Sequence, residues 1–214
     1  LSRLVYGIRA TVFLSLLTMA ITSALGACVG LVSGFFRNRI DDVLMRICDV
    51  MMSFPSEVMI LAIVGMMGPG LENVVIANVV AKWPWYARMV RSIVRQYSDK
   101  DYIRFAKVAG GSSIRIMMRH LLPGTAGELF VLTTLDTGSV ILMISALSFL
   151  GLGVQPPTPE WGMMLNEAKE VMTMYPLQMI PAGMAILLVV AAFNFLGDSL
   201  RDAFDPKHAG RERS

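Results

Sequence analysis

The chain has 214 residues, of which 55% are hydrophobic and 16% are charged, and its formal net charge is +3. A soluble globular domain carries about 25% charged residues, so this composition excludes an ordinary soluble protein. It indicates a helical membrane protein instead, because a span of the hydrocarbon core takes about 20 consecutive, mostly apolar residues.

Apolar runs of this kind occur five times along the chain. We therefore predict an all-α, polytopic membrane protein with five spans in one transmembrane domain, residues 1–214. The third run is the weakest, because it contains Lys82 and the segment 83–85, Trp-Pro-Trp. The chain begins with Leu and holds an odd number of runs, which suggests that its natural start and one further span are missing. The runs are Thr11–Phe36, Val50–Met67, Leu71–Val90, Leu129–Leu150 and Leu177–Leu196.

Basic residues predict which ends of the spans face the cytoplasm. Residues 82–119 hold nine Lys and Arg against two acidic side chains, and cytoplasmic loops are enriched in Lys and Arg. We therefore predict that residues 91–128 and the tail 201–213 are cytoplasmic. Membrane topology explains this basic run, so nucleic-acid binding is not predicted.

The opposite ends of the spans are predicted to face outward. They include the short turn 67–71 and the loop 155–175, which holds three Glu and one Lys. Three prolines stiffen this loop, and Trp161 is expected at the membrane interface. The loop either receives a soluble partner or only caps the spans. Arg3 and Arg9 also fall on the outward side, and they are the one discordance.

A basic segment interrupts the apolar runs between residues 101 and 123. Apolar side chains recur there at spacings of three and four residues, which predicts one face of a helix over 101–109. Arg104 and Lys107 lie on its other side. The predicted apolar face consists of Tyr102, Phe105, Ala106 and Ala109.

A sharp turn is predicted directly after this helix. Gly110 and Gly111 permit it without a steric penalty from Cβ, and Ser112 or the next serine suits the cap of a second helix, 114–121. Pro123 is expected to end that helix. The two short helices are either an amphipathic element on the membrane surface or a docking element for a groove in a soluble partner.

The spacing of these residues resembles the cytoplasmic coupling loop, or EAA loop, of bacterial ABC importer permeases. That loop reads Glu-Ala-Ala, three residues, Gly, nine residues, Ile-x-Leu-Pro, and it falls here within residues 98–123. Arg104 replaces the Glu, Phe105 the first Ala and His120 the Ile. The identical positions are Ala106, Gly110, Leu122 and Pro123.

Four further segments resemble the dipeptide, oligopeptide and nickel branch of that family. The resemblance implies the type I ABC permease fold, six spans in the full protein and a place among the lipids of the bacterial inner membrane. The segments are RICDVMMSFPS at 46–56, WYARMVRS at 85–92, SFLGLGVQPPTPEWG at 148–162 and FNFLGDSLRDAFDP at 193–206. The ATPase-coupling residues that it implies are Tyr102, Arg104, Phe105, Ala106, Gly110, Gly111, Ser112 and Pro123.

The same resemblance implies a division of labour among subunits. A second, homologous permease, two ATPase subunits and an extracytoplasmic substrate-binding protein are expected as partners. ATP and Mg belong to the ATPases, because this chain contains no GxxxxGK[ST] loop, and we expect it to bind no cofactor. The GDSL of 197–200 and the DxxH of 205–208 match signatures of a serine esterase family. They are crowded behind an apolar run, so we do not predict an enzyme.

Polar side chains inside apolar runs are candidates for a translocation pathway, because they are costly there. Asp136 shares a helical face with Ser139 and Met143, and Glu57 and Asn78 lie in the second and third runs. Each could instead be a buried polar group that a neighbouring helix satisfies. We assign no metal ligands, because Met, of which the chain has 17, mostly fills irregular core space.

The transported substrate is predicted from subfamily likeness. The segments WPWYARMVRS at 83–92, TLDTG at 134–138 and YPLQM at 175–179 look most like the C subunit of nickel-type permeases. We therefore predict import of nickel or of a metal–chelate (metallophore) complex, with dipeptide or oligopeptide import as the alternative. Composition alone also allows a secondary transporter or a channel.

Overall fold

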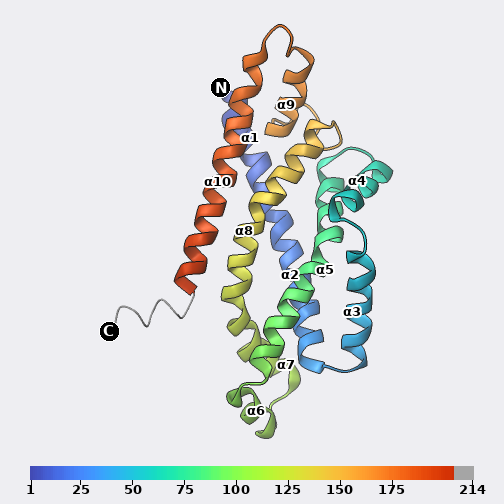
Figure 1. The fold of residues 1–214 in the computed structure, drawn as a ribbon, viewed down its shortest axis with the longest axis vertical. Helices are drawn as coiled ribbons and strands as arrows, with labels where there is room; N and C mark the ends of the chain where they lie inside the picture. Colours follow the sequence, from blue (N-terminus) through green and yellow to red (C-terminus); the bar gives the residue numbers. More distant parts are fainter. Residues whose placement is uncertain (205–214) are drawn as a thin grey trace, which may run out of the picture.

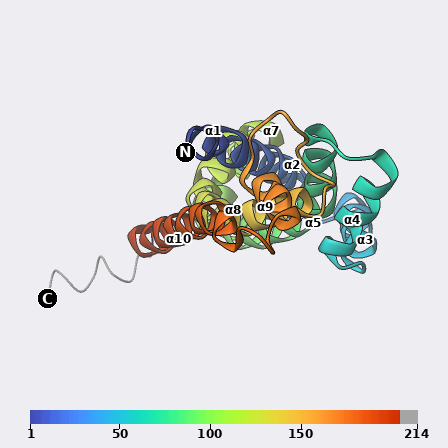
Figure 2. The same cartoon turned by 90° about the horizontal axis from the view of Figure 1, so that it is seen from above.

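The computed structural model describes residues 1–204, and every regular element within them is a helix, as predicted. Three long helices, α2 (Leu14–Phe36), α5 (Leu71–Ser98) and α8 (Leu122–Phe149), run along the long axis and pack on one another (Figure 1). Seen from above, α10 (Met179–Phe204) flanks α8 at one edge of this group, and α3 and α4 occupy the other edge (Figure 2). The rest of the basic tail and the DxxH segment lie outside the described residues.

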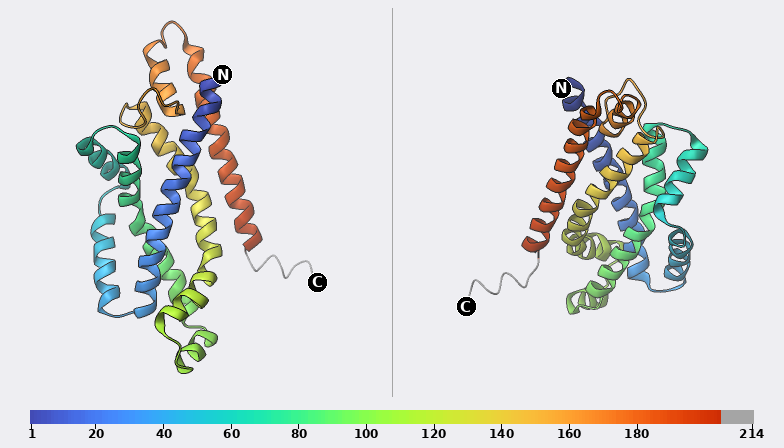
Figure 3. Two further views of the ribbon diagram at one scale, coloured as in Figure 1. Left: turned by 180° about the vertical axis from the view of Figure 1, so that it is seen from behind. Right: turned by 45° about the horizontal axis from the view of Figure 1, so that its top comes forward.

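Shorter elements complete the ends of the bundle. Helix α1 (Ser2–Ile8) continues through a π-helical turn, Arg9–Phe13, into α2, and the view from behind shows them as one rod (Figure 3). The others are α3 (Arg39–Met52), α4 (Ser56–Met67), α6 (Asp101–Val108), α7 (Ser113–Ile116), a π-helical turn Met117–Leu121, α9 (Trp161–Glu170) and a 3-10 turn Pro176–Gln178.

The predicted count of five spans is not confirmed. Three helical stretches in residues 1–204 are long and apolar enough to cross a membrane: Ser2–Phe36, Ser113–Phe149 and Pro176–Phe204. They contain the first and fifth predicted runs and all of the fourth except Leu150. Helix α5 has 28 residues but carries Lys82 and several arginines, and it is not among the three.

The second predicted run, Val50–Met67, is wrong as a continuous helix. The chain breaks after Met52 and resumes at Ser56, with a bend of 80° between α3 and α4. Pro55 explains the break, because proline has no N–H to donate and disfavours helical geometry at the preceding Phe54. If this bent pair is one broken span, the count rises to four.

The ends of the helices group as the charge pattern predicts. Helices α6 and α7, the α2–α3 turn and the end of α10 lie toward one end of the molecule, and α9 and the α4–α5 turn lie toward the other (Figure 1). The discordant Arg3 lies at the α9 end, where its guanidinium pairs with Glu167 at 2.7 Å. An acidic partner thus offsets this basic residue.

Trp161 is buried within the protein and does not lie on its surface, where a side chain in contact with the membrane interface would lie. It is 1% exposed, and its indole N–H donates to the backbone oxygen of Leu4 at 2.9 Å. The neighbouring Glu160 is also buried and accepts from the backbone N–H groups of the first turn of α9, at 2.9 Å each. The hydroxyl of Thr11 donates to the same carboxylate at 3.1 Å. This part of the loop is therefore bound tightly to α1 and to the π-helical turn that follows α1.

Close packing of α2 against α5 depends on glycines spaced four residues apart on α2. A Cβ at Gly26 would lie 2.3 Å from Cβ of Tyr86, and one at Gly30 would lie 2.6 Å from the backbone oxygen of Ala87. Small residues at this spacing let the backbones of membrane helices approach closely. Gly34 continues the pattern against Val94.

We predict that Gly30→Ala destabilises the protein, because its new methyl group meets backbone atoms that have little room to move. Overpacking of this kind costs about 1–3 kcal/mol, which exceeds the gain of about 1 kcal/mol from helix propensity. The matched control is Gly183→Ala on α10, where nothing lies within 4 Å of the added Cβ. Tryptophan-detected thermal unfolding in detergent should show a lower midpoint for Gly30→Ala alone.

Candidate functional site

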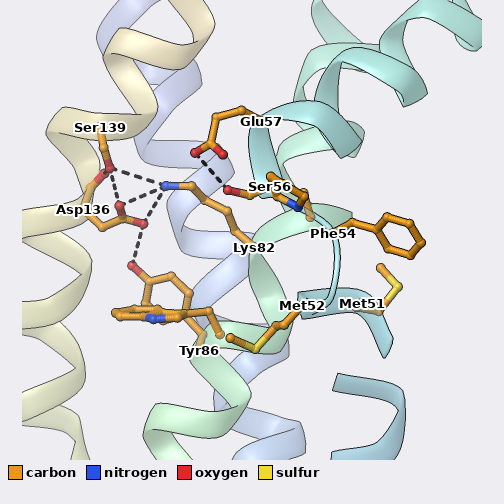
Figure 4. A pocket seen from close by; sticks show the side chains of 12 residues that line it. Met51, Met52, Phe54, Ser56, Glu57, Lys82, Tyr86, Asp136 and Ser139 are labelled. Carbon is orange, nitrogen blue, oxygen red and sulfur yellow. Dashed lines mark hydrogen bonds and ion pairs between the residues drawn. The ribbon is translucent and has the colours of Figure 1, made fainter. Parts of the chain in front are cut away.

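A pocket of about 490 Å³ lies between α5, α8 and the break between α3 and α4. Its upper part is polar and its lower part carries thioethers and aromatic rings, as Figure 4 shows. The volume falls within the range of about 300–1,000 Å³ that is typical of small-molecule sites. The residues that line it are Met51, Met52, Phe54, Pro55, Ser56, Glu57, Ala81, Lys82, Trp85, Tyr86, Asp136 and Ser139.

An ion pair between α5 and α8 forms the polar part of the pocket. The ammonium of Lys82 lies 2.9 and 3.0 Å from the two carboxylate oxygens of Asp136. The same carboxylate accepts from the hydroxyls of Tyr86, at 3.2 Å, and Ser139. The carboxylate of Glu57, from the first turn of α4, lies on the other side of the ammonium (Figure 4).

The structure brings three of the five predicted pathway residues together. Asp136, Ser139 and Glu57 all line the pocket. Met143 instead packs against the apolar core, and Asn78 is fully buried, with its amide N–H donating to the backbone oxygen of Val74 at 2.8 Å. The donor of Asn78 is thus satisfied within its own helix and its buried side-chain oxygen has no hydrogen-bond partner within residues 1–204, so no neighbouring helix of this part of the chain satisfies it.

Sequence reasoning missed Lys82 and Tyr86 as parts of the site. A lysine in an apolar run was read as a weakness of that span, although an intramembrane charge usually has a partner of opposite sign. Asp136 was the available partner, 54 residues away in the sequence. The residue types alone could therefore have suggested the pair.

The loop between α5 and α8 has the predicted helix, turn and cap. The turn follows α6, and Gly110 adopts a φ of 79°, a conformation that favours glycine. The N–H of Gly111 donates to the backbone oxygen of Ala106 at 3.0 Å, which closes the end of the helix. The hydroxyl of Ser112 caps α7 by accepting from the N–H of Arg115 at 3.4 Å.

Pro123 does not end the second helix, contrary to the prediction. The chain stays helical from Ser113 through Phe149. A π-helical turn, Met117–Leu121, lies just before the proline, where widened helical geometry accommodates the missing N–H. The loop is therefore joined rigidly to α8.

The packed face of α6 differs from the predicted one. Ile103 is fully buried and Ala106 packs beside it, whereas Phe105 is 73% exposed. The loop is held to the bundle by Ile103 together with the buried Ile116, Met117 and Leu121, and it presents other apolar side chains outward. The exposed apolar side chains of the loop are Tyr102, Phe105, Val108, Ile114 and Met118.

Ionic contacts fix the bundle next to this loop. Arg37, at the end of α2, pairs with Asp99 at 2.9 Å, and this hydrogen bond lowers the pKa of the Asp99 carboxyl. The buried Asp41 of α3 accepts from Arg91 at 2.5 and 2.8 Å and also from Arg95. Helices α2 and α3 are thereby linked to the end of α5 from which the loop emerges.

Residues 26–209 match the family model described as binding-protein-dependent transport system inner membrane component. The match covers most of the chain. The chain belongs to this family. It is therefore an importer permease of the inner membrane, as the resemblance of the loop indicated, and the matched residues include both the pocket and the loop.

Curated relatives support the assignment to this permease family over nearly the whole chain. The metal-staphylopine import system permease protein CntC of Staphylococcus aureus is 41% identical over 213 residues, which are 100% of this chain and 74% of the relative. The nickel transport system permease protein NikC of Escherichia coli is 38% identical, over 96% and 74%. The di/tripeptide transport system permease protein DppC of Pseudomonas aeruginosa is 42% identical, over 97% and 68%. All three are transport permeases, not enzymes.

We predict that Ile103→Ala loosens α6, because a truncated buried Ile costs about 2–5 kcal/mol and this side chain is the fully buried one of the helix. Amide hydrogen exchange in residues 101–112 should become faster, while residues 71–98 stay protected. Phe105→Ala on the exposed face is the control and should leave exchange unchanged. Equal exchange in the two variants would show that Ile103 does not anchor α6.

Proposed function

We propose that this permease carries nickel or a metal–chelate complex across the bacterial inner membrane. The observation that supports this cargo is the mixed charge of the pocket, in which two carboxylates, Asp136 and Glu57, face one ammonium, Lys82. The carboxylates suit a cationic complex, and the ammonium suits a carboxylate of its chelator. The metal-staphylopine and nickel relatives agree with such a cargo.

A second candidate cargo is a short peptide. The di/tripeptide relative favours it, and a zwitterionic peptide also presents one carboxylate and one ammonium to the pocket. In either case we propose that Asp136, Ser139 and Glu57 lie on the pathway, together with Lys82 and Tyr86. A second, homologous permease completes that pathway within the lipid bilayer.

We propose that residues 98–123 couple this pathway to ATP. The exposed apolar surface around Phe105 supports the proposal, since 73% of this side chain is uncovered and an amphipathic helix that presents such a face suits a groove in a partner. Two ATPase subunits that hold ATP and Mg receive the loop at the cytoplasmic face. ATP binding pulls the loop inward and opens the outer side, and hydrolysis resets it. An extracytoplasmic binding protein delivers cargo near residues 155–175.

The cargo proposal predicts uptake by the complete importer reconstituted in proteoliposomes. Radiolabelled nickel should accumulate in an ATP-dependent manner with a chelator present, and Asp136→Asn should reduce this uptake roughly tenfold or more, because it leaves Lys82 without its partner. Asp49→Asn, which removes the partner of Arg88 outside the pocket, is the control. Uptake of a labelled dipeptide without any nickel signal would make the metal assignment wrong and favour the second candidate.

The coupling proposal predicts that Gly110→Asp separates ATP hydrolysis from transport. The position has open space around an added Cβ but a positive φ of 79°, so the spans should stay folded while the docking surface gains a charge. Gly110→Asn is the matched control, because Asn has nearly the same shape and tolerates this backbone region.

The measurement is the ratio of transported cargo to hydrolysed ATP in the reconstituted complex. This ratio should fall for Gly110→Asp and stay closer to that of the original protein for Gly110→Asn. Normal transport by Gly110→Asp would show that this turn is not the coupling element.

A further inference from the structure

The Lys82–Asp136 ion pair connects the same two helices that the loop joins. Helix α5 carries Lys82 and ends at Ser98, directly before the loop, about 24 Å away at 1.5 Å per residue. Helix α8 carries Asp136 and follows the loop without a break in its helical path. The loop and the ion pair therefore link α5 and α8 at two levels. A movement of the loop is thus transmitted to the ion pair, and a movement of the ion pair is transmitted to the loop.

This ion pair is accessible from the pocket. The side chains of Lys82 and Asp136 are 17% and 23% exposed, and both point into the space that Glu57 faces from α4 (Figure 4). By contrast, the carboxylate of Asp41 in the neighbouring network is only 3% exposed. A small molecule in the pocket can thus reach the Lys82–Asp136 pair directly.

Separating the two charges is costly inside an apolar bundle. When one partner of a poorly solvated ion pair is removed, the other charge is left uncompensated. When each of the two charges receives a new partner of opposite sign, neither is left uncompensated. A molecule that parts Lys82 from Asp136 must therefore offer a negative group to the ammonium and a positive group to the carboxylate. A molecule with only one charged group meets half of this requirement, and a molecule without charged groups meets none of it.

We propose that the Lys82–Asp136 pair is a latch that cargo opens by exchange. The cargo carboxylate takes the ammonium of Lys82, and its cationic centre takes Asp136, with Glu57 nearby as a second acceptor. Without cargo, the pair holds α5 to α8 and restrains the loop. This inference rests on the proposed import function and adds the chemical class of the ligand and a role for Lys82.

The ligand class is a small molecule that combines a carboxylate with a cationic centre. A chelated metal ion and the ammonium group of a peptide are two sources of the same chemistry. Matched probes separate them. Nickel–histidine and nickel–histamine differ by the carboxylate of the chelator, and alanyl-alanine and its C-terminal amide differ by the carboxylate of the peptide.

The test measures saturable binding of these four probes to the importer in nanodiscs without its binding protein, so that only the membrane site selects. Within either the two nickel probes or the two peptide probes, the original complex should bind the probe with the carboxylate more tightly. The set in which this preference occurs shows whether the cationic centre is a chelated metal ion or a peptide ammonium group. Lys82→Met should abolish this preference, because it should lower the affinity for the probe with the carboxylate roughly tenfold or more. Arg88→Met is the control and should keep the preference, because Arg88 lies on the same helix but pairs with Asp49 of α3.

Hydrolysis of ATP without cargo tests the latch itself. Lys82→Met and Asp136→Asn should each raise this rate about fivefold or more, in line with usual coupling between sites. The exchanged variant Lys82→Asp/Asp136→Lys restores an ion pair and should bring the rate back down. If a single variant fails to assemble, the exchanged variant can still be measured against the original complex.

Several results would overturn the latch. They are an unchanged carboxylate preference in Lys82→Met, an equal loss of all four probes, no saturable binding to the original complex, and a rate in the exchanged variant that stays as high as in the single variants. The proposed import function fails separately, by a lack of ATP-driven uptake in the complete importer with its binding protein. Binding selectivity and uptake thus report on the two proposals independently.

Discussion

The close contact between α2 and α5 is the constraint on which the site depends. Gly26 offers no side chain, so Tyr86 of α5 lies directly against α2 and is fully buried. From that position its hydroxyl reaches the carboxylate of Asp136 on α8, at 3.2 Å. Lys82 precedes Tyr86 by one helical turn and therefore faces the same carboxylate. A bulkier α2 would push α5 outward and would move both side chains away from α8.

Polar contacts tie the helices together at three levels, and their exposure separates their roles. Near the loop, Asp41 is almost completely enclosed and accepts from several donors at once, as suits a permanent link between α3 and α5. At the α9 end, Glu160 is buried and bound by backbone N–H groups. At the middle level, the charged pair of Lys82 and Asp136 borders the pocket between α5, α8 and the α3–α4 break. The enclosed carboxylates of Asp41 and Glu160 hold the scaffold, whereas a ligand in the pocket reaches the Lys82–Asp136 pair.

The sequence predicted the features that depend on local chemistry. The glycine turn, the serine cap and the apolar runs of α2, α8 and α10 follow from neighbouring residues, and the structure has them. The break at Pro55 also has a local signal, a proline inside the run Val50–Met67, but the prediction of this span rests on its apolar composition alone. Trp161 was misplaced because its partner, Leu4, lies 157 residues away in the sequence. Likewise, Ile103 packs in one cluster with residues of α2 and α5, and no local pattern reveals these partners.

Under the proposed function, the pocket offers a physical reason why one permease scaffold can serve different cargoes. Relatives named for metal chelates and for peptides share similar overall identity with this chain, so the common scaffold does not distinguish these cargoes. A pocket that presents one ammonium and two carboxylates recognises the chemistry that such cargoes share, namely a carboxylate beside a cationic centre. Discrimination must then come from the apolar part of the lining, which consists of Met51, Met52, Phe54, Pro55, Ala81 and Trp85. Charge would thus govern opening of the pathway, whereas the shape of this apolar part would govern which charged molecule fits.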